Sequence, residues 1–452
     1  MITTIVQVSI AYFLLLGAQI LGAGPHHSKA EETTMALGFV LIASYLVGTL
    51  CPRVKMPMIT GYMLSGVFFG PYFLAFIDPS LAVLSHNAIH ELELINHVAL
   101  GLIAFTAGGE LKLESIKSRW KALLSITFIQ SLSAFVGVGC LLYFVGGQLP
   151  GLSDFSPTQL MVASSLLACT AMANSPSTTI AVINETQSEG PVTEIALGVT
   201  VIKDMLVIAC FAATMSFSRA MMTPGKGLDL GFALDLGWEI VGSLLVGVVL
   251  GGLLSLYIGK IGAELPVLLM GVAFLADYLA EPFHLHGLLI CMMAGFVVEN
   301  FTPHGHTFIH AVERNSLPVY VIFFTLGGAQ MELPALKVVG LVATILVVAR
   351  AFFTWLGTSA AAKLSKESGS VVKYAWTGFL GQAGVTLGFA VLVSNDFPSI
   401  GNQLRTIIVA AIALNQVFGP VIMRFGLAAA GEIGEREEDE EDDLLAGEEV
   451  LV

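Results

Sequence analysis

Hydrophobic runs of roughly 20 residues recur along almost the whole of this 452-residue chain, and each run is long enough to cross a bilayer as a helix. Only 12% of the residues are charged, whereas an ordinary soluble protein has about 25%. These two features predict an all-helical polytopic membrane protein. They argue against a soluble enzyme and against a nucleic-acid-binding protein.

The pattern of apolar runs predicts about thirteen to fourteen membrane spans. Their approximate ranges are 3–21, 36–51, 57–76, 94–110, 121–145, 158–183, 193–217, 236–258, 262–281, 285–300, 316–332, 335–362, 374–394 and 404–428. The first run could instead be a signal peptide, because it ends in the small residues Gly22 and Ala23. It lacks the basic segment with which such a peptide begins, so we favour a retained helix.

The loops between these runs predict the orientation of the chain. If fourteen spans alternate in direction, eleven Lys and Arg residues fall on one side and only five on the other. Cytoplasmic loops carry the excess of basic residues, so both termini are expected in the cytoplasm. We expect a plasma or inner membrane rather than an organelle. The five residues on the outer side are Lys29, Arg219, Lys226, Lys337 and Arg405.

The acidic end of the chain carries most of the net charge of −14. Between Glu432 and Glu449 there are eleven acidic residues and one arginine. A block of like charges is typical of a solvated, disordered segment. Residues 432–452 are therefore predicted to form a disordered cytoplasmic tail.

Three charged residues fall inside predicted spans. Lys203 and Asp204 are neighbours in the run 193–217, and Arg350 lies within 335–362. An ionisable residue within a membrane span is costly to insert and is usually functional. The alternative is an ion pair that only holds helices together.

Two further spans contain breaks. Residues 168–179 pass from an alanine-rich stretch into Asn174, Ser175 and Pro176, where proline removes a backbone donor. Residues 378–388 contain four glycines together with Gln382 and Thr386. Interrupted helices in corresponding places of two halves indicate a transporter site. Close packing of helices at glycine is the alternative.

These elements are symmetric about the span 236–258. Six spans on each side of it, arranged as inverted repeats, would bring both breaks and all three charges to the middle of the membrane. The predicted parts are 1–35 (an extra helix and loop), 36–217 (first repeat), 218–260 (linker helix), 261–431 (second repeat) and 432–452 (tail). Oxygen ligands there suit a monovalent cation at Asp204. The residues expected to bind the ion or carry the proton are Asp204, Lys203, Asn174, Ser175 and Thr170, and those expected to support the site are Arg350, Pro176, Gln382 and Thr386. No transition metal and no cofactor are expected.

In these and other segments the chain resembles the monovalent cation/proton antiporter superfamily, in its Kef-like and bacterial sodium/proton exchanger branch. The similarity runs from about residue 36 to residue 432. Its landmarks occur in order at 56–71, 102–111, 174–176, 323–328, 415–420 and 430–432.

The resemblance implies the sodium/proton antiporter fold with two crossed discontinuous helices. It also implies a homodimer in which a mobile core moves like an elevator, exchanging sodium or potassium for protons. Asp204 matches the aspartate that binds cation and proton in turn, and Arg350 matches a basic residue beside the site. Lys203 departs from the family, which mostly has Asp, Asn or Gln at that position.

The lysine raises a question about mechanism. At about 4 Å, a like charge opposes a bound cation by roughly 4 kcal/mol at an effective dielectric constant of about 20. Lys203 could point away and pair with helix carbonyls, or release its proton when a cation binds. A third alternative is that the positive Lys203/Arg350 site accepts an anion.

Other classes of membrane protein remain as alternatives. A cation channel is disfavoured because no carbonyl-lined filter sequence is present. A non-transporting sensor or scaffold, with the acidic tail as a docking arm, would not need Asp204. We favour a secondary transporter, which is not an enzyme, whose partners are the two ions, membrane lipids and a second copy of the chain.

Overall fold

The computed structural model describes residues 29–74, 83–222, 230–262, 264–283, 285, 287–331, 333–382 and 385–434. Within these ranges the chain is helical and contains no strand. The predicted first span, 3–21, and most of the predicted tail lie outside the described residues.

The first half of the chain forms helices that match the predicted spans in order. The helices are α2 (Lys29–Gly48), η1 (Cys51–Val54), α3 (Met58–Phe69), α4 (His86–Glu110), α5 (Leu113–Val145), η4 (Gly146–Gln148), α6 (Pro157–Met172), α7 (Pro176–Thr186) and α8 (Pro191–Met222). The predicted span 158–183 is thus two helices, α6 and α7, separated by a break at 173–175.

The second half repeats this pattern after one long helix. The helices are α9 (Leu230–Lys260), α10 (Leu265–Ala280), η5 (Glu281–Phe283), α11 (Gly287–Phe301), α12 (Gly305–Ala329), α13 (Leu333–Leu364), α14 (Gly369–Tyr374), η6 (Ala375–Phe379), α15 (Val385–Asp396) and α16 (Gly401–Ala430). The predicted span 374–394 is also broken, between η6 and α15.

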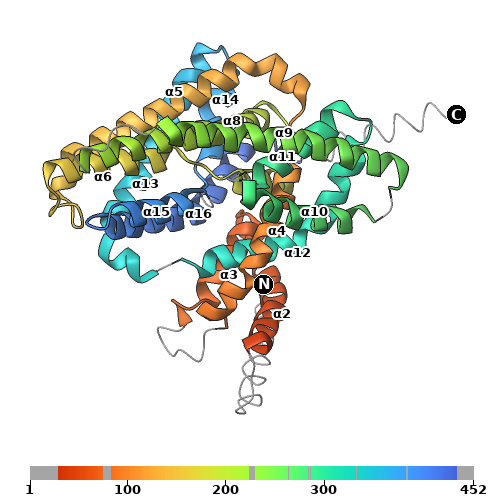
Figure 1. The fold of residues 1–452 in the computed structure, drawn as a ribbon, viewed down its shortest axis with the longest axis horizontal. Coiled ribbons are helices and arrows are strands. Elements are labelled where there is room, and N and C mark those ends of the chain that lie inside the picture. The colour runs from red at the N-terminus through yellow and green to blue at the C-terminus, as the bar shows by residue number, and fades with distance from the viewer. Residues whose placement is uncertain are drawn as a thin grey trace.

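Several of these helices are suited to a membrane. Seven helical segments of the described residues are long and apolar enough to cross a bilayer, and five shorter apolar helices accompany them. The α5, α6 and α8 helices pack against one another along much of their length (Figure 1). The chain is therefore an integral, multi-pass membrane protein with the predicted all-helical fold.

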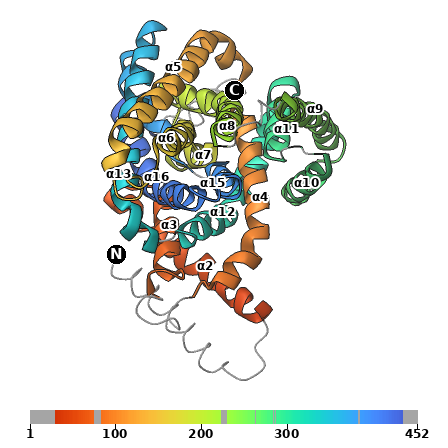
Figure 2. The same cartoon turned by 60° about the vertical axis from the view of Figure 1, so that its left-hand side comes forward.

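The helices divide into two groups by their contacts. The first helix group contains α2, α3, α4, α9, α10, α11 and α12, and the second helix group contains α5, α6, α7, α8, α13, α14, η6, α15 and α16. Figure 2 shows α9 and α10 beyond α4 at one edge, with α6, α7 and α15 on the other side of α4. The two groups meet mainly where α4 contacts α7 and where α3 contacts α16.

Packing inside the first helix group follows the predicted repeat. The α3 helix packs on α12, and α4 packs on α11. If α3 corresponds to α11 and α4 to α12, each of these pairs is the image of the other. Two copies related by a pseudo-two-fold axis produce this exchange of partners. The residue boundaries proposed for the repeats remain predictions.

Glycines allow both pairs to approach closely. A Cβ atom at Gly66 of α3 would lie 1.9 Å from the carbonyl oxygen of Thr325, and one at Gly108 of α4 would lie 1.8 Å from that of Met292. Small residues let membrane helices pack backbone to backbone. This close approach accounts for glycines in several of the sequence landmarks. The facing glycines are Gly328 of α12 and Gly295 of α11.

The start of the predicted acidic tail differs from expectation. Glu432 is buried, and its carboxylate accepts hydrogen bonds from the backbone N–H groups of Val192 (2.7 Å) and Thr193 (2.8 Å) at the start of α8. The uncapped amides and the dipole of a helix N-terminus favour a carboxylate there. Glu432 therefore belongs to the fold, and the expectation of disorder was wrong for this residue.

Candidate functional site

The two interrupted helices cross and hydrogen-bond to each other at their breaks. The backbone N–H of Ser175 donates to the carbonyl of Gly381 at 2.9 Å. The hydroxyl of Thr179, one turn into α7, donates to the carbonyl of Gly378 at 2.9 Å. The predicted crossing of two discontinuous helices is thus confirmed.

The local sequence explains the break after α6. Pro176 is the first residue of α7, where its missing N–H costs nothing. Ser175 is the N-cap of α7, and its hydroxyl accepts from the N–H of Thr178 at 3.2 Å and from the Thr178 hydroxyl at 3.0 Å. Pro176 and Ser175 therefore serve the break itself, and the Ser175 hydroxyl is already engaged.

Arg350 occupies the crossing point. Its side chain is 1% exposed and comes from α13 of the second helix group. All five N–H donors of the guanidinium find an acceptor, and four of these acceptors are carbonyls freed by the two breaks. The Nε atom donates to Ala171 (3.0 Å), one terminal nitrogen to Leu380 (2.7 Å) and the Asn415 side chain (3.3 Å), and the other to Ala173 (2.6 Å) and Phe379 (2.8 Å).

Two amide side chains extend this network. Gln382 donates from Nε2 to the carbonyl of Thr170 at 2.6 Å and accepts from Asn415 Nδ2 at 2.8 Å. The Thr170 hydroxyl donates to the carbonyl of Leu167 at 2.8 Å, within its own helix. Gln382 and Arg350 therefore compensate carbonyls of the broken helices.

Lys203 and Asp204 are both buried on α8, with exposed fractions of 0% and 8%. The Lys203 amine has no hydrogen-bond partner in the described part of the chain, and it lies 5.3 Å from the centre of the Phe379 ring. No hydrogen bond or ion pair of the Asp204 carboxylate occurs among the described residues either. The alternative of a Lys203–Asp204 ion pair that holds helices together is thus not seen.

Asn174 and Thr386, which lie at the two breaks, have uncommitted oxygens. Asn174 donates from Nδ2 to the hydroxyl of Thr200 at 2.8 Å, and Thr200 is one turn before Asp204 on α8. The Oδ1 atom of Asn174 and the hydroxyl of Thr386 are buried without a hydrogen-bond partner among the described residues. A buried oxygen without a partner is costly unless it binds something.

Lys203 aside, whose amine has no hydrogen-bond partner among the described residues, the residues predicted for the site fall into two sets. Asp204, Asn174 and Thr386 offer free oxygens. Thr170, Ser175, Pro176, Gln382 and Arg350 hold the broken backbone in place. The prediction missed Asn415, which bonds both Arg350 and Gln382. Two adjacent amides, Asn415 and Gln416, in the apolar middle of the run 404–428 were the available signal.

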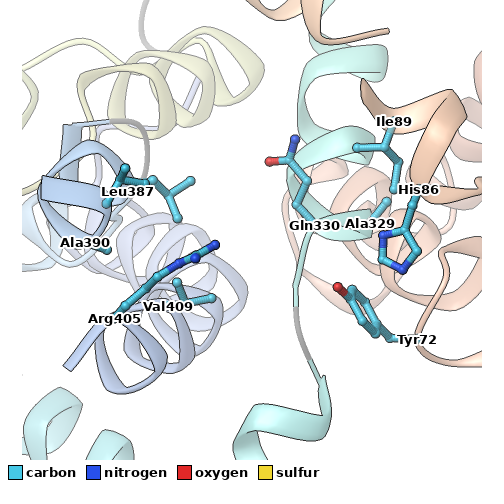
Figure 3. Close-up of a pocket in the computed structure, with 10 residues that line it drawn as sticks. Tyr72, His86, Ile89, Ala329, Gln330, Leu387, Ala390, Arg405 and Val409 are labelled. Carbon is cyan, nitrogen blue, oxygen red and sulfur yellow. The ribbon is translucent and has the colours of Figure 1, made fainter. Parts of the chain in front are cut away.

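A cavity of about 250 Å³ lies between the two helix groups (Figure 3). On one side it is lined by Gln330 at the end of α12 and by His86 at the start of α4, and on the other by Leu387 of α15 and Arg405 of α16. Leu387 directly follows Thr386. Arg405 is one of the five basic residues that the charge pattern assigns to the outer side.

Comparison with known proteins adds an independent line of evidence. A family model described as "Sodium/hydrogen exchanger, transmembrane" matches residues 39–427. A Na(+)/H(+) antiporter of Enterococcus hirae is 22% identical over 397 residues, covering 86% of this chain and 96% of that protein. The Na(+)/H(+)-K(+) antiporter GerN of Bacillus cereus is 25% identical over 220 residues, covering 47% of this chain and 52% of that protein.

A solved structure has the same fold. The sodium proton antiporter MjNhaP1 from Methanocaldococcus jannaschii matches with a TM-score of 0.64 at 17% sequence identity. The match covers 89% of this chain and 97% of that chain. The crossed broken helices described above thus belong to a fold that a solved antiporter shares.

Proposed function

The chain belongs to the sodium/hydrogen exchanger family, and from this premise we propose that it exchanges a monovalent cation, sodium or potassium, for protons across a membrane. One observation carries the proposal. The Asp204 carboxylate is buried one turn after Thr200, whose hydroxyl accepts from Asn174 at the first break, and it has no hydrogen bond or ion pair among the described residues. A buried carboxylate with no partner needs a proton or a cation to offset its charge.

Competition at this carboxylate would couple the two ions. A proton and a cation each neutralise Asp204, but they cannot do so at once. The empty carrier would have to move a buried carboxylate that has neither proton nor cation bound to it through the bilayer interior, which is expensive. Cation movement in one direction therefore requires proton movement in the other. The oxygens of Asn174 and Thr386 would complete the cation's coordination.

Arg350 is better suited to a structural role than to binding an anion. Its five N–H donors are already occupied by four carbonyls and by Asn415. An anion would have to displace these short bonds within a buried network. This argues against the alternative of an anion site formed by Lys203 and Arg350.

The surroundings of Lys203 bear on the lysine question. Its amine has no partner among the described residues, so the alternative in which it pairs with helix carbonyls lacks support. A charged, unpaired ammonium beside a bound cation would oppose binding. We therefore favour release of the Lys203 proton when the cation binds, as buried lysines can lose their charge.

The two helix groups support an elevator-type movement. The second helix group holds the broken helices and all the candidate ion-site residues, and it contacts the first mainly through α3 and α4. We propose that it moves against the first helix group, which would form the dimer contact with a second copy. Both termini would lie in the cytoplasm of a plasma or inner membrane.

The test is exchange in proteoliposomes loaded with a pH-sensitive dye. Addition of sodium, potassium or lithium should dissipate a preset pH gradient in wild-type vesicles. The variant Asp204→Asn, which keeps the size of the side chain but cannot take the charge, should abolish the response. Full exchange by a folded Asp204→Asn variant would remove Asp204 from this role and favour a sensor or scaffold.

A further inference from the structure

The interface between the two helix groups has the cavity at one end. At its other end, a carboxylate of the second helix group caps a helix of the first. Glu185 lies in the last turn of α7, and its side chain is 14% exposed. The carboxylate accepts hydrogen bonds from the backbone N–H groups of Met58 at 2.6 Å and Ile59 at 3.4 Å. These are the first two amides of α3.

The α3 helix has no cap of its own. Its N-cap residue is Pro57, which has no side-chain oxygen and makes no side-chain cap hydrogen bond. The first amides of a helix lack partners within the helix, and a negative charge is favoured beside them. Glu185 therefore supplies, from the second helix group, the cap that the sequence before α3 does not contain.

Arg424 of α16 completes the contact. One of its terminal nitrogens lies 3.5 Å from the Glu185 carboxylate and donates to the carbonyl of Met56 at 3.4 Å. Thus α7 and α16 both hold the segment that leads into α3. Charge-assisted hydrogen bonds of this kind are about twice as strong as neutral ones.

The two ends of the group interface are therefore unlike each other. The segment before α3 carries Arg53 and Lys55, which the charge pattern assigns to the cytoplasmic side. The groups are joined by polar contacts there, whereas the outer end contains the cavity beside Arg405. A second helix group that slides so as to present its site to the cytoplasm must pull Glu185 away from α3.

We propose that Glu185 is a positioning residue that acts as a cytoplasmic latch between the two helix groups and favours the outward-facing carrier. The proposal rests on the exchange function proposed above. Breaking the bonds to Met58 and Ile59 is part of the cost of turning the site inward. Weakening the latch therefore shifts the population toward the inward-facing state without altering the ion site.

Two variants test the latch from its two sides. Glu185→Gln removes the charge but keeps the shape. Met58→Pro removes the donated N–H, and proline is well tolerated as the first residue of a helix. Pro57 has φ −61° and ψ 147°, which suits a residue that precedes proline. Met58→Ala is the matched control, because it shortens the same side chain but keeps the N–H.

A second control addresses the loss of a cytoplasmic carboxylate in general. Glu194 pairs with Arg119 at 2.7 Å, and both belong to the second helix group. Glu194→Gln therefore removes a comparable carboxylate whose salt bridge to Arg119 lies within one helix group.

The measurement is the apparent KM for the cation at each face, in right-side-out and everted vesicles. In Glu185→Gln and Met58→Pro the cytoplasmic KM should fall and the outer KM should rise. The ratio of outer to cytoplasmic KM should increase about tenfold, as expected for the loss of one charge-assisted contact. Met58→Ala and Glu194→Gln should keep the wild-type ratio.

The outcomes separate this proposal from the function itself. If wild-type vesicles exchange no cation for protons, the proposed function fails. If they do exchange, an unchanged KM ratio in folded Glu185→Gln and Met58→Pro overturns the latch. Should Glu185→Gln not fold, Met58→Pro decides alone. Failure of Met58→Pro to fold while Met58→Ala folds would give this amide a purely structural role and would equally overturn the proposal.

Discussion

The backbone N–H of Ser175 donates to the carbonyl of Gly381 at 2.9 Å, so the two broken helices are bonded to each other at the place where each is broken. Unpaired backbone inside a membrane is tolerated only where it is buried in protein or lines a cavity. Here each break supplies part of the compensation for the other. Arg350 and Gln382 bond further carbonyls of the breaks, whereas Asp204, Asn174 and Thr386 keep oxygens without a hydrogen bond among the described residues.

Arg350→Lys should destabilise the protein even though the charge is retained. A lysine has three donors on one nitrogen and cannot reach the five acceptors that the planar guanidinium reaches. Carbonyls of both breaks would lose their partners, at a cost of about 3 kcal/mol or more. Thermal unfolding in detergent measures the effect as a lower Tm.

Arg405→Lys is the control for this substitution. Arg405 is exposed at the cavity and makes no hydrogen bond within the described residues. The Tm of Arg405→Lys should therefore stay near that of the wild type. Equal stability of Arg350→Lys and wild type would contradict the role given to the guanidinium.

The charged part of the site was predictable because charge is rare in a membrane span. Lys203, Asp204 and Arg350 stand out in apolar sequence, and the breaks at 174–176 and 378–388 are marked by proline and glycine. The partners of Arg350 were not predictable. Four of them are main-chain carbonyls, which have no signature in the sequence and become acceptors only when two distant segments cross.

Two other features of the fold, at Asn415 and Glu432, could not be predicted from sequence patterns. Asn415 lies in the family landmark 415–420, but one amide in a sequence does not reveal which buried groups it will contact. Glu432 is the first residue of the acidic run, and the run as a whole predicts a disordered tail. It is buried because α16 ends beside the start of α8, whose first amides donate to it, and counting charges along the sequence cannot predict this contact.

Lys203→Gln should keep exchange but change its charge stoichiometry. If Lys203 releases a proton when the cation binds, the wild type moves two protons for each cation, one from Asp204 and one from Lys203. Without the lysine, only the Asp204 proton remains. Wild-type exchange should then respond to an imposed membrane potential and depend more steeply on pH, whereas the variant should be electroneutral and less steep.

Sodium-driven proton flux at clamped potentials measures this difference in proteoliposomes. The same response to potential in both proteins would exclude Lys203 as a proton carrier. If neither Lys203→Gln nor Lys203→Asp folds, a structural role for the amine is favoured.

Glu432→Gln should destabilise the protein, whereas removal of residues 435–452 should not. The Glu432 carboxylate bonds two amides and the Thr193 hydroxyl at the start of α8. Loss of its charge there should cost about 1–2 kcal/mol. Chains that end at Gly434 keep this contact, so their Tm should match the wild type. A truncated chain as unstable as Glu432→Gln would place the stabilising contact beyond residue 434.

Gly108→Ala should strongly destabilise the first helix group. The added methyl group would lie 1.8 Å from the carbonyl oxygen of Met292 and 2.7 Å from the backbone nitrogen of Phe296, so α4 and α11 would have to separate. Backbone atoms cannot yield as a flexible side chain does, and overpacking of this kind costs about 3 kcal/mol or more.

The measurement is Tm in detergent, with Gly38→Ala as the matched control. Gly38 lies in α2 with no atom within 4 Å of its added Cβ, and alanine there should be neutral or stabilising by up to about 1 kcal/mol. If both variants have the Tm of the wild type, α4 and α11 do not pack backbone to backbone, and the glycines in the sequence landmarks need another explanation.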